Sequence, residues 1–378
     1  MQPTVEPAED PAPFVFGQVG GRLPDDRALP ALRTIRTSGL AAAMPDLRLG
    51  DGPVELRLLN YVPGSRATLD ARVGNRRFAV KLYADDPAPE AEAYQRLADE
   101  GLAQDIGARV PRLLAWERDL RILAISWLDG PSASRLIREG QGARAGKLAA
   151  SWLHSASRRE GSLGPPRSSG HMLYRVGASV GAVSAADPVL GATAKVAARM
   201  LVRTQPEKET LQLVNGALYA RHILDLGDGP GVIDWQQFGQ GPIEVDAGMF
   251  LASVSRLALR RAASKDEATQ ATETFLSGIR GLSETTRLEW YWAAGLLHLA
   301  ASGLKTGRKR EAPRESHALV VEAIRHAESA GGKPIDVSTV GTTPTPAPDS
   351  RRGHPTDPTA GEEPDATAVR RVDGRRSG

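Results

Sequence analysis

The stretch 213–234 constrains the fold of this chain more than any other, because two apolar runs enclose a polar loop and end on a carboxylate. Residues 213–214 lead into the loop, and a second apolar run follows at 223–226. The Gly-Asp-Gly sequence at 227–229 predicts a tight turn, since Asp-Gly pairs adopt positive φ at low cost. The chain then returns as a short strand that ends on Asp234. We therefore predict a hairpin whose ends could hold a metal ion and a phosphate between them.

The segment 54–83 alternates apolar and polar residues in the manner of β-strands. Gly74 and Asn75 predict a tight turn between the last two of these strands. In the last strand the apolar residues share one face, whereas Lys81 points to the other. An ammonium group on a mostly apolar strand needs an anion nearby, since burying it alone would be costly. Lys81 is thus either an anion-binding residue or a surface residue of an edge strand.

A helix and two further strands complete the first part of the chain. The apolar spacing of residues 88–99 predicts a helix, and 110–114 and 120–127 predict strands. Together with the strands before them, these segments predict a five-stranded antiparallel sheet with one inserted helix. Residues 29–49 have helical spacing of their own, ended by Pro45, and predict a helix that packs on this sheet.

Composition divides the chain into four parts. Residues 1–28 are rich in Pro, Asp and Glu and predict a disordered leader, and 29–128 form the predicted N-terminal lobe. Asp-Gly-Pro at 129–131 is a natural linker to a predicted helical C-terminal lobe at 129–330. The remainder, 331–378, has too few apolar residues to bury a core and predicts a disordered tail. Helical patterns in the C-terminal lobe cover 132–140, 143–157, 171–205, 246–262, 265–280, 284–304 and 313–329.

The overall composition excludes several classes of protein. Of the 378 residues 41% are hydrophobic, enough to bury a large core. The 48 basic and 45 acidic residues leave a net charge of +3, which gives no electrostatic footprint for nucleic acid. There is no cysteine, so disulfides and thiolate metal sites are excluded. No apolar run approaches the roughly 18 residues of a membrane span, and the acidic N-terminus is unlike a secretion signal. We therefore expect a cytoplasmic protein without nucleic-acid or membrane partners.

The loop and hairpin resemble the catalytic core of the aminoglycoside phosphotransferase family, the small-molecule branch of the protein-kinase-like fold. That family writes the loop as His-Gly-Asp-x-His-Pro-x-Asn and continues with Ile-Asp-Trp or Ile-Asp-Phe. Here Gly216 and the Ile-Asp-Trp at 233–235 match, but the catalytic Asp falls on Ala217 and the metal-binding Asn on His222. The resemblance covers roughly residues 50–300. It implies an α+β, bilobal protein-kinase-like fold with an N-terminal five-stranded antiparallel sheet, one helix there, and a mostly helical C-terminal lobe.

The resemblance implies that Lys81 contacts the α- and β-phosphates of ATP and is held by a helix carboxylate. Glu90 and Glu92 compete for that role, and they point to different faces of the predicted helix. Glu90 lies seven residues before Leu97, the spacing that the family usually shows, so we favour Glu90. The alternative is that both are solvated acids of a helix N-terminus.

Two further parts of a nucleotide site follow from the resemblance. The Tyr-Val-Pro-Gly-Ser-Arg sequence at 61–66 fits the loop that covers the phosphates in related phosphotransferases. There the backbone around Gly64 and the side chain of Arg66 would cap the phosphates, although Pro-Gly is also an ordinary hairpin turn. Adenine would lie against the hinge at 126–129, which includes Leu128.

The resemblance also assigns Mg²⁺ to Asp234 and places His222 at the second ligand position. Imidazole is a poorer Mg²⁺ ligand than an amide oxygen, so His222 could instead bind phosphate or Mn²⁺, or serve only the structure. A cap of the following turn is the alternative for Asp234. Asp246 matches the last Asp of the family, and we expect it to hold the loop backbone. Ala217 has no side-chain oxygen to accept a proton, and Tyr219 offers only a phenol, a group that with a usual pKa of about 10 is a poor base at neutral pH.

The sequence leaves two functions open. One is an ATP-dependent phosphotransferase of specialised metabolism that acts on a small-molecule or peptide hydroxyl, with transfer impaired or altered because Ala217 replaces the catalytic Asp. The other is a pseudokinase, a nucleotide-binding or scaffolding partner of another protein. Lys81 and Asp234 favour nucleotide binding under both hypotheses. Ala217 and His222 favour the second, or unusual chemistry in the first.

Overall fold

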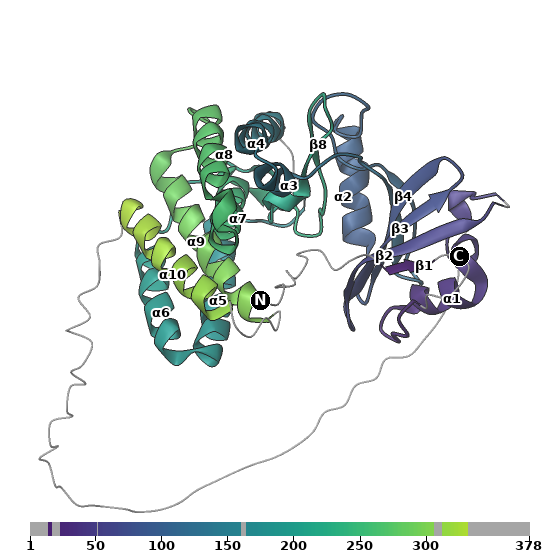
Figure 1. Ribbon diagram of the computed structural model, residues 1–378, viewed down its shortest axis with the longest axis horizontal. Helices are drawn as coiled ribbons and strands as arrows, with labels where there is room; N and C mark the ends of the chain where they lie inside the picture. Colours follow the sequence, from purple (N-terminus) through teal and green to yellow (C-terminus); the bar gives the residue numbers. More distant parts are fainter. Residues whose placement is uncertain (1–13, 17–22, 51, 160–163, 306–311, 332–378) are drawn as a thin grey trace, which may run out of the picture. The chain divides into compact units, whose positions relative to one another are not determined.

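The computed structural model describes residues 14–16, 23–50, 52–159, 164–305 and 312–331, which all lie within one compact unit ending at Ile335 (Figure 1). Most of the predicted leader and nearly all of the predicted tail therefore fall outside the described residues. The described chain begins with an antiparallel sheet and two helices and continues as a mostly helical part. This arrangement confirms the predicted α+β class.

The predicted five-stranded antiparallel sheet is confirmed by strands β2 to β6. The full order is β1-β2-β3-β4-β6-β5, so a sixth strand extends the sheet beyond β2. This strand, β1, lies within the predicted disordered leader and pairs with the edge of β2, which would otherwise present unpaired N–H and C=O groups. The strands are β1 (Phe14–Phe16), β2 (Val54–Val62), β3 (Arg66–Val73), β4 (Arg76–Tyr83), β5 (Leu113–Glu117) and β6 (Ile122–Ser126).

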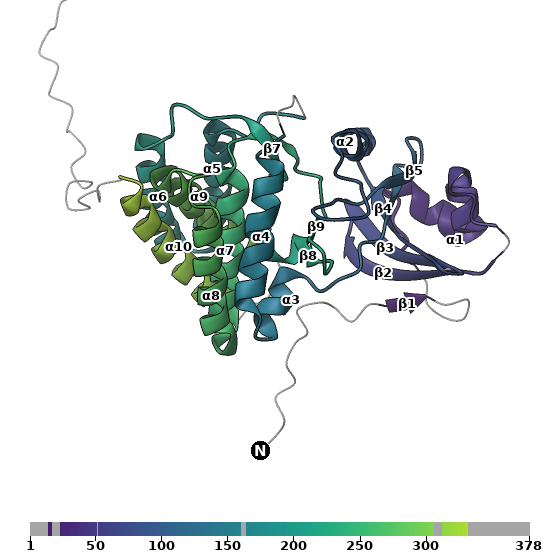
Figure 2. The same ribbon diagram turned by 90° about the horizontal axis from the view of Figure 1, so that it is seen from above.

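Different helices cover the two faces of the sheet (Figure 2). On one face Phe78 and Leu82 are buried in a core cluster with the apolar residues of α1 (Pro30–Ala43). On the other face lies α2 (Ala88–Asp99), whose buried residues belong to the larger core cluster of the molecule. Because strand residues alternate between faces, Lys81 points toward α2 and away from the apolar cluster.

The C-terminal part is built from helices that bury one face each in the larger core cluster. None of the helices in the described ranges is long and apolar enough to span a membrane. The helices are α3 (Ala133–Arg138), α4 (Gly142–Ala156), α5 (Ser169–Ala186), α6 (Pro188–Arg203), α7 (Glu244–Arg260), α8 (Lys265–Gly278), α9 (Thr285–Lys305) and α10 (Ala312–Ser329).

One strand boundary differs from the prediction because of proline, and the pattern at 171–205, for which one or two helices were expected, forms two. β5 begins at Leu113 and not at residue 110, since Pro111 has no N–H to contribute to a ladder. The helical pattern at 171–205 is split into α5 and α6 at Asp187, whose side chain accepts hydrogen bonds from the first N–H groups of α6. Pro188 then occupies the first position of α6, where its missing N–H costs nothing.

The predicted hairpin is confirmed as strands β8 (Ile223–Asp225) and β9 (Pro230–Val232), which pair in antiparallel register. Its turn contains Gly227 at a φ of 86°, the left-handed conformation that glycine adopts at low cost. A second short pair, β7 (Gln212–Val214) with β10 (Gly239–Gly241), brackets the loop from the other side. The polar loop 215–222 is thus fixed at both ends by strands.

Candidate functional site

The backbone of the loop is held by Asp246, at the start of α7. Its two carboxylate oxygens accept hydrogen bonds from the backbone N–H groups of Asn215, at 2.7 Å, and Gly216, at 2.8 Å. Burial raises the pKa of Asp246 to about 7, although both N–H groups act in the opposite direction. Gly216 has a φ of 77°, and a Cβ there would lie 2.0 Å from the carbonyl oxygen of Gln237. The structural role that the sequence predicts for Asp246 is confirmed by these contacts.

Lys81, Glu90 and Asp234 meet in the structure. The Lys81 ammonium forms an ion pair with Glu90, and its Nζ lies 3.7 Å from Oδ1 of Asp234. The Tyr83 hydroxyl donates to the other oxygen of Glu90 at 2.5 Å, so both oxygens of that carboxylate are engaged. Glu92, the alternative partner, is exposed. The pair predicted from the family spacing is therefore the one that forms.

The opposite charges of this cluster offset the cost of burying each charged group. Burial lowers the pKa of Lys81, but attraction to Glu90 and Asp234 more than compensates, so the pKa of Lys81 is raised. For Asp234 burial raises the pKa, yet the nearby cations, Lys81 first among them, bring it down to about 2. Both side chains are therefore fully charged at neutral pH. A lysine and a carboxylate held this close are arranged to share a phosphate and a cation.

Asp234 has an unusual backbone conformation. Its φ of 65° lies in the left-handed region, which costs a non-glycine residue about 1–3 kcal/mol and persists only where the surroundings enforce it. One such constraint is Asn215, whose side-chain amide donates to the carbonyl oxygens of Ile233, at 3.4 Å, and Asp234, at 3.0 Å. Sequence reasoning missed this role of Asn215, because its only signal is a departure from the histidine of the family.

His222 lies against Asp234 in a defined tautomer. Its Nδ1 is 3.0 Å from the carbonyl oxygen of Ala217, an acceptor, so Nδ1 carries the proton. Burial lowers the pKa of His222 to about 4, more than the attraction of Asp234 raises it, and the ring is neutral at pH 7. Its Nε2 is then a lone-pair acceptor 3.4 Å from Oδ2 of Asp234. Two acceptors facing each other form a site that a cation between them would complete.

This donor set fits a divalent metal ion, with one imidazole nitrogen and one carboxylate. A hard ion such as Mg²⁺ prefers oxygen ligands, whereas imidazole suits the transition metals better. Within the described ranges no group of three His, Asp or Glu side chains gathers to hold a metal ion. The remaining ligands would therefore have to come from phosphate oxygens and water, as is usual for nucleotide-bound metal ions.

The position of the family's catalytic Asp presents only a methyl group. Ala217 is buried, and its N–H is 3.3 Å from the side-chain oxygen of Asn215, which accepts from it. Tyr219, two residues further, makes an edge contact with the His222 ring and lies beneath the guanidinium of Arg221, 4.2 Å from its ring centre. These residues provide no carboxylate oxygen within the loop that could replace the missing base.

The 61–66 loop is held by residues that the sequence did not single out. Gly64 has a φ of 69°, and its N–H donates to Oδ2 of Asp26 at 2.7 Å. The Tyr61 hydroxyl donates to the same oxygen at 3.0 Å, and Arg66 donates to the side-chain oxygen of Gln236. Asp26 belongs to the predicted disordered leader, so no sequence signal pointed to this contact. The phosphate-capping roles of Gly64 and Arg66 stay predictions.

Leu128 connects the hinge to the hairpin. A Cβ at Gly231 of β9 would lie 3.0 Å from a methyl group of Leu128, so this glycine allows the leucine to approach the hairpin closely. Next to it, the Arg77 guanidinium lies over the Trp127 ring, 3.7 Å from its centre. The contact of Leu128 with adenine stays a prediction.

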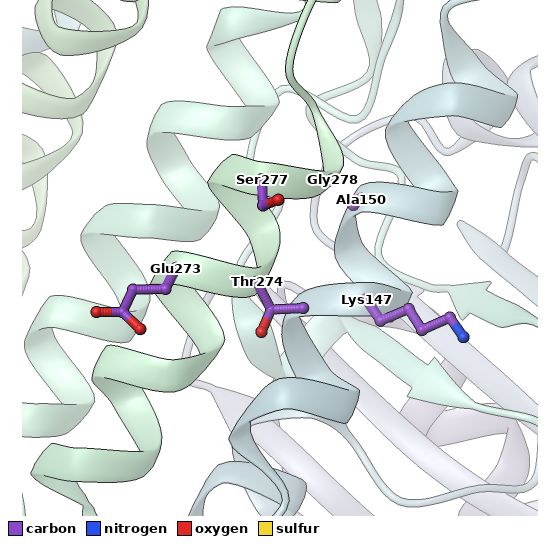
Figure 3. A pocket seen from close by; sticks show the side chains of 6 residues that line it. All are labelled: Lys147, Ala150, Glu273, Thr274, Ser277 and Gly278. Carbon is purple, nitrogen blue, oxygen red and sulfur yellow. The ribbon is translucent and has the colours of Figure 1, made fainter.

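A surface hollow elsewhere does not coincide with these residues. It lies between α4 and α8 and is lined by Lys147, Ala150, Glu273, Thr274, Ser277 and Gly278 (Figure 3). The side chains of Lys147 and Glu273 point away from each other there, so no polar groups converge in it. Nearby, His154 contacts the carbonyl oxygen of Gly278 at 2.8 Å. The candidate site therefore lies at Asp234 and not in this hollow.

Comparisons with known proteins agree with this geometry. The family model described as "Phosphotransferase enzyme family" matches residues 65–279 of the 378-residue chain. A thermostable mutant of aminoglycoside phosphotransferase APH(4)-Ia, in ternary complex with AMP-PNP and hygromycin B, is similar at 14% identity and a TM-score of 0.55, over 76% of this chain and 98% of that chain. A ternary complex of such a mutant with ADP and hygromycin B is similar at 15% identity and a TM-score of 0.51, over 74% and 95%.

A further structure of this enzyme gives the same result. The crystal structure of APH(4)-Ia is similar at 15% identity and a TM-score of 0.52, over 73% of this chain and 94% of that chain. At such low identities the likeness shows a shared fold alone. A search of curated proteins gave no match.

Proposed function

The chain belongs to the phosphotransferase enzyme family, and we propose on that basis that it binds ATP with a divalent metal ion and transfers phosphate slowly to a small-molecule or peptide hydroxyl. The observation that carries this proposal is the meeting of Lys81, from the sheet, with Asp234, from the loop, at 3.7 Å. Their opposite charges suit the two components of a metal-bound triphosphate. The similar structures in complex with AMP-PNP or ADP add support, since they share the fold.

Each residue of the cluster has a distinct part in this proposal. Lys81, aligned by Glu90, would bind the α- and β-phosphates, while Gly64 and Arg66 would cover them. Asp234 and His222 would hold the metal ion, which supplies charge neutralisation on the phosphate oxygens when bound. Leu128 would contact the adenine from the hinge.

The transfer itself would proceed without a protein base. The acceptor oxygen forms a bond to the γ-phosphorus, the bond to the bridging oxygen breaks, and ADP leaves with that electron pair. The acceptor proton goes to solvent, because the methyl group of Ala217 cannot accept it. Loss of general-base help costs roughly 10²–10⁴-fold in rate. Phosphoryl transfer depends mostly on positioning and electrostatics, so a slow reaction remains possible.

A second candidate function is a pseudokinase that binds nucleotide and acts on a partner protein. One observation favours it: the two substituted residues of the loop bond to each other, through His222 Nδ1 and the Ala217 carbonyl oxygen at 3.0 Å. A self-contained loop of this kind can keep the site folded without any catalytic demand on it.

Two measurements test the proposal. Calorimetric titration with AMP-PNP and Mg²⁺ or Mn²⁺ should show binding that Asp234→Ala removes, while Asp105→Ala, a change at a largely exposed carboxylate, leaves it intact. An ATP-turnover assay then compares the wild type with Ala217→Asp. Slow turnover that rises in the variant supports an impaired transferase. No turnover in either protein, with intact binding, supports the pseudokinase, and absence of nucleotide binding overturns both.

A further inference from the structure

A row of polar side chains begins just before α5 and continues along one face of this helix. Arg167, His171, Arg175 and Ser179 follow one another at intervals of four, which places them on a single helical stripe. Arg167 donates from Nη1 to Nε2 of His171 at 3.0 Å. Because that imidazole nitrogen accepts from an arginine, it carries no proton of its own.

The row ends at the loop that contains Ala217. Arg175 donates from Nη1 to the carbonyl oxygen of Gly216 at 2.9 Å, one residue before Ala217. Its Nη2 donates to Nε2 of His298 at 3.0 Å, on α9, which packs beside α5 (Figure 2). The Arg175 guanidinium therefore lies next to the position from which the family's catalytic Asp would act.

The cations of this row lack an opposing charge. In the part of the chain that the structure describes, neither Arg167 nor Arg175 forms an ion pair with an Asp or Glu. Their hydrogen-bond partners are backbone carbonyl oxygens, imidazole nitrogens and, for Arg175, the side chain of Tyr219, and none of these is a carboxylate. Other arginines of the same lobe are paired, as Arg144 is with Asp225 at 2.7 Å and Arg256 is with Glu315. Arg167 and Arg175 thus differ from these two arginines in having no carboxylate partner.

The lack of a neighbouring anion is reflected in the lowered pKa values of the side chains in this row. Burial lowers the pKa of Arg167 and of Arg175, and for Arg167 the charge of Arg175 adds to the effect. The pKa of His171 is lowered by burial and then by both arginines. Half-buried positive charges without a counter-ion are costly, and a bound anion would relieve that cost. Arg221, stacked on Tyr219 within the loop, adds a further cation close to Ala217.

We propose that the acceptor is an anion, bound through a carboxylate or phosphate group to Arg175 and Arg167, with its hydroxyl directed to the loop at Ala217. This inference rests on the proposed phosphotransferase function and names the substrate class of the same site. Guanidinium groups bind such oxyanions with two parallel hydrogen bonds. An aminoglycoside, which carries ammonium groups, would be repelled by this row.

The test uses inorganic phosphate as the probe and the full-length protein. Phosphate replaces chloride at constant ionic strength, and binding is measured by calorimetry with AMP-PNP and metal ion already saturating. Arg175→Gln should raise the phosphate Kd by about tenfold or more, the scale of a lost charge-assisted hydrogen bond. Arg199→Gln, an exposed arginine on the neighbouring α6, makes the same change in charge and should leave the Kd unchanged.

Further variants separate the two sites and guard against misfolding. The double variant Lys81→Met/Glu90→Gln, titrated with phosphate in the absence of AMP-PNP, should bind no AMP-PNP but keep phosphate binding, because the proposed anion site includes neither residue. If Arg175→Gln fails to fold, Arg167→Gln, at a half-buried position before α5, should weaken phosphate in the same way. Arg175→Lys, which keeps the charge but not the planar fork, should lie between wild type and Arg175→Gln.

The contrary outcomes are equally specific. Phosphate binding that is lost in Lys81→Met/Glu90→Gln and kept in Arg175→Gln would overturn the anion site and leave the proposed function standing. Hygromycin B that binds more tightly than phosphate, with no change in Arg175→Gln, would overturn it as well. Failure of AMP-PNP to bind the wild type would instead count against the proposed function, and phosphate binding that depends on Arg175 would then still stand.

Discussion

The two sides of the candidate site hold their charges differently. On the nucleotide side the Lys81 ammonium is paired with Glu90 and lies 3.7 Å from Asp234, so the charges balance within the chain. On the proposed acceptor side Arg167 and Arg175 have no carboxylate partner among the described residues. A balanced cluster keeps its geometry without a ligand, whereas an unbalanced one is completed by a ligand of opposite charge.

This difference in charge balance coincides with which residues match the family pattern and which depart from it. Lys81, Glu90 and Asp234 match the family pattern, and these are the residues that balance one another. The loop has exchanged an Asp for Ala217, which removes a negative charge one residue from the carbonyl oxygen that Arg175 contacts. A carboxylate restored at residue 217 would compete with an anionic acceptor for Arg175.

The largest expected effect is a loss of stability when the ion pair of Lys81 with Glu90 is broken. Lys81→Met leaves Glu90, which is only 6% exposed, without its cation. Breaking a buried ion pair by removing one partner costs about 3–5 kcal/mol, so the free energy of unfolding in urea should fall on that scale. The double variant Lys81→Met/Glu90→Gln should regain most of the stability, since the amide can still accept from Tyr83, and yet bind no nucleotide.

Glu92→Gln is the matched control for that experiment, because Glu92 is exposed on the same helix. It should change neither stability nor nucleotide affinity. If Lys81→Met were as stable as the wild type, the charges on the nucleotide side would not be balanced in the way that we describe.

A balanced cluster also exists inside the helical lobe, at His326 of α10. This side chain is 2% exposed and stacks on Trp292 at 3.9 Å between ring centres. Its Nδ1 contacts Glu289, and its Nε2 lies 3.7 Å from Glu322 and 2.7 Å from Nη2 of Arg325. Burial lowers the pKa of His326 and so does Arg325, but the hydrogen bonds to Glu289 and Glu322 outweigh them, so the pKa is raised. The helical lobe thus supplies carboxylates for its cations elsewhere, which sharpens the contrast with Arg175.

The pH dependence of stability tests this cluster. The folded protein holds the His326 proton more tightly than the unfolded chain, so the contribution is complete below the ordinary pKa of 6.5 and is lost as pH rises through the raised folded value. His326→Gln should therefore lose about 1.5–3 kcal/mol of unfolding free energy at pH 6 and less at pH 9. His317→Gln, at an exposed position of the same helix, serves as the control, and an equal loss at both pH values would contradict the ion pairing.

A smaller effect is expected on how the affinity for AMP-PNP depends on the metal ion. With an imidazole nitrogen facing Asp234, AMP-PNP should bind roughly tenfold more tightly with Co²⁺ than with Mg²⁺ in the wild type, since nitrogen ligands favour transition metals. His222→Asn supplies an amide oxygen and should reduce this ratio toward one. Calorimetry with each metal ion measures the ratio directly. A ratio that is the same in both proteins would show that His222 is not a ligand.

The smallest effect is expected at the loop that covers the phosphates. Asp26 places a carboxylate on the N–H of Gly64, which lowers the pKa of Asp26 and places a negative charge where phosphates are expected. Asp26→Asn keeps an acceptor but removes the charge, and should raise nucleotide affinity about threefold at low salt and less at high salt. Asp25→Asn, at the neighbouring exposed residue paired with Arg36, should have no effect. A fall in affinity would mean that Asp26 organises the loop for binding.

Much of the fold and half of the site were predictable from residue patterns. Alternation over 54–83 and the Asp-Gly turn predicted strands that form in the structure, because side-chain periodicity reflects which face is buried. Lys81 stood out as a charged residue in an apolar strand, whereas Glu90, Asp234 and Asp246 were identified from the resemblance to the family. The structure brings all four to the loop or its immediate neighbours.

Contacts between distant segments were not predictable in this way. The bond of Asp26 to Gly64 joins a segment read as disordered to a turn 38 residues away, and the bond of Arg175 to Gly216 joins residues 41 apart. Neither residue stands out in composition or periodicity. Such pairings depend on how packed elements cross in space, which local patterns do not encode.

The sequence by itself determined the elements, the pair of lobes and the loss of a carboxylate at residue 217, since each of these depends on residue type and local spacing. Only the tertiary structure decided which charges find partners. It gives Lys81 two carboxylates and gives Arg175 a carbonyl oxygen and an imidazole, because the crossing of α5 and α9 at the loop fixes what each guanidinium can reach. The packing therefore decides that Arg167 and Arg175 form a positive site without a carboxylate partner. The composition, with a net charge of only +3, does not decide it.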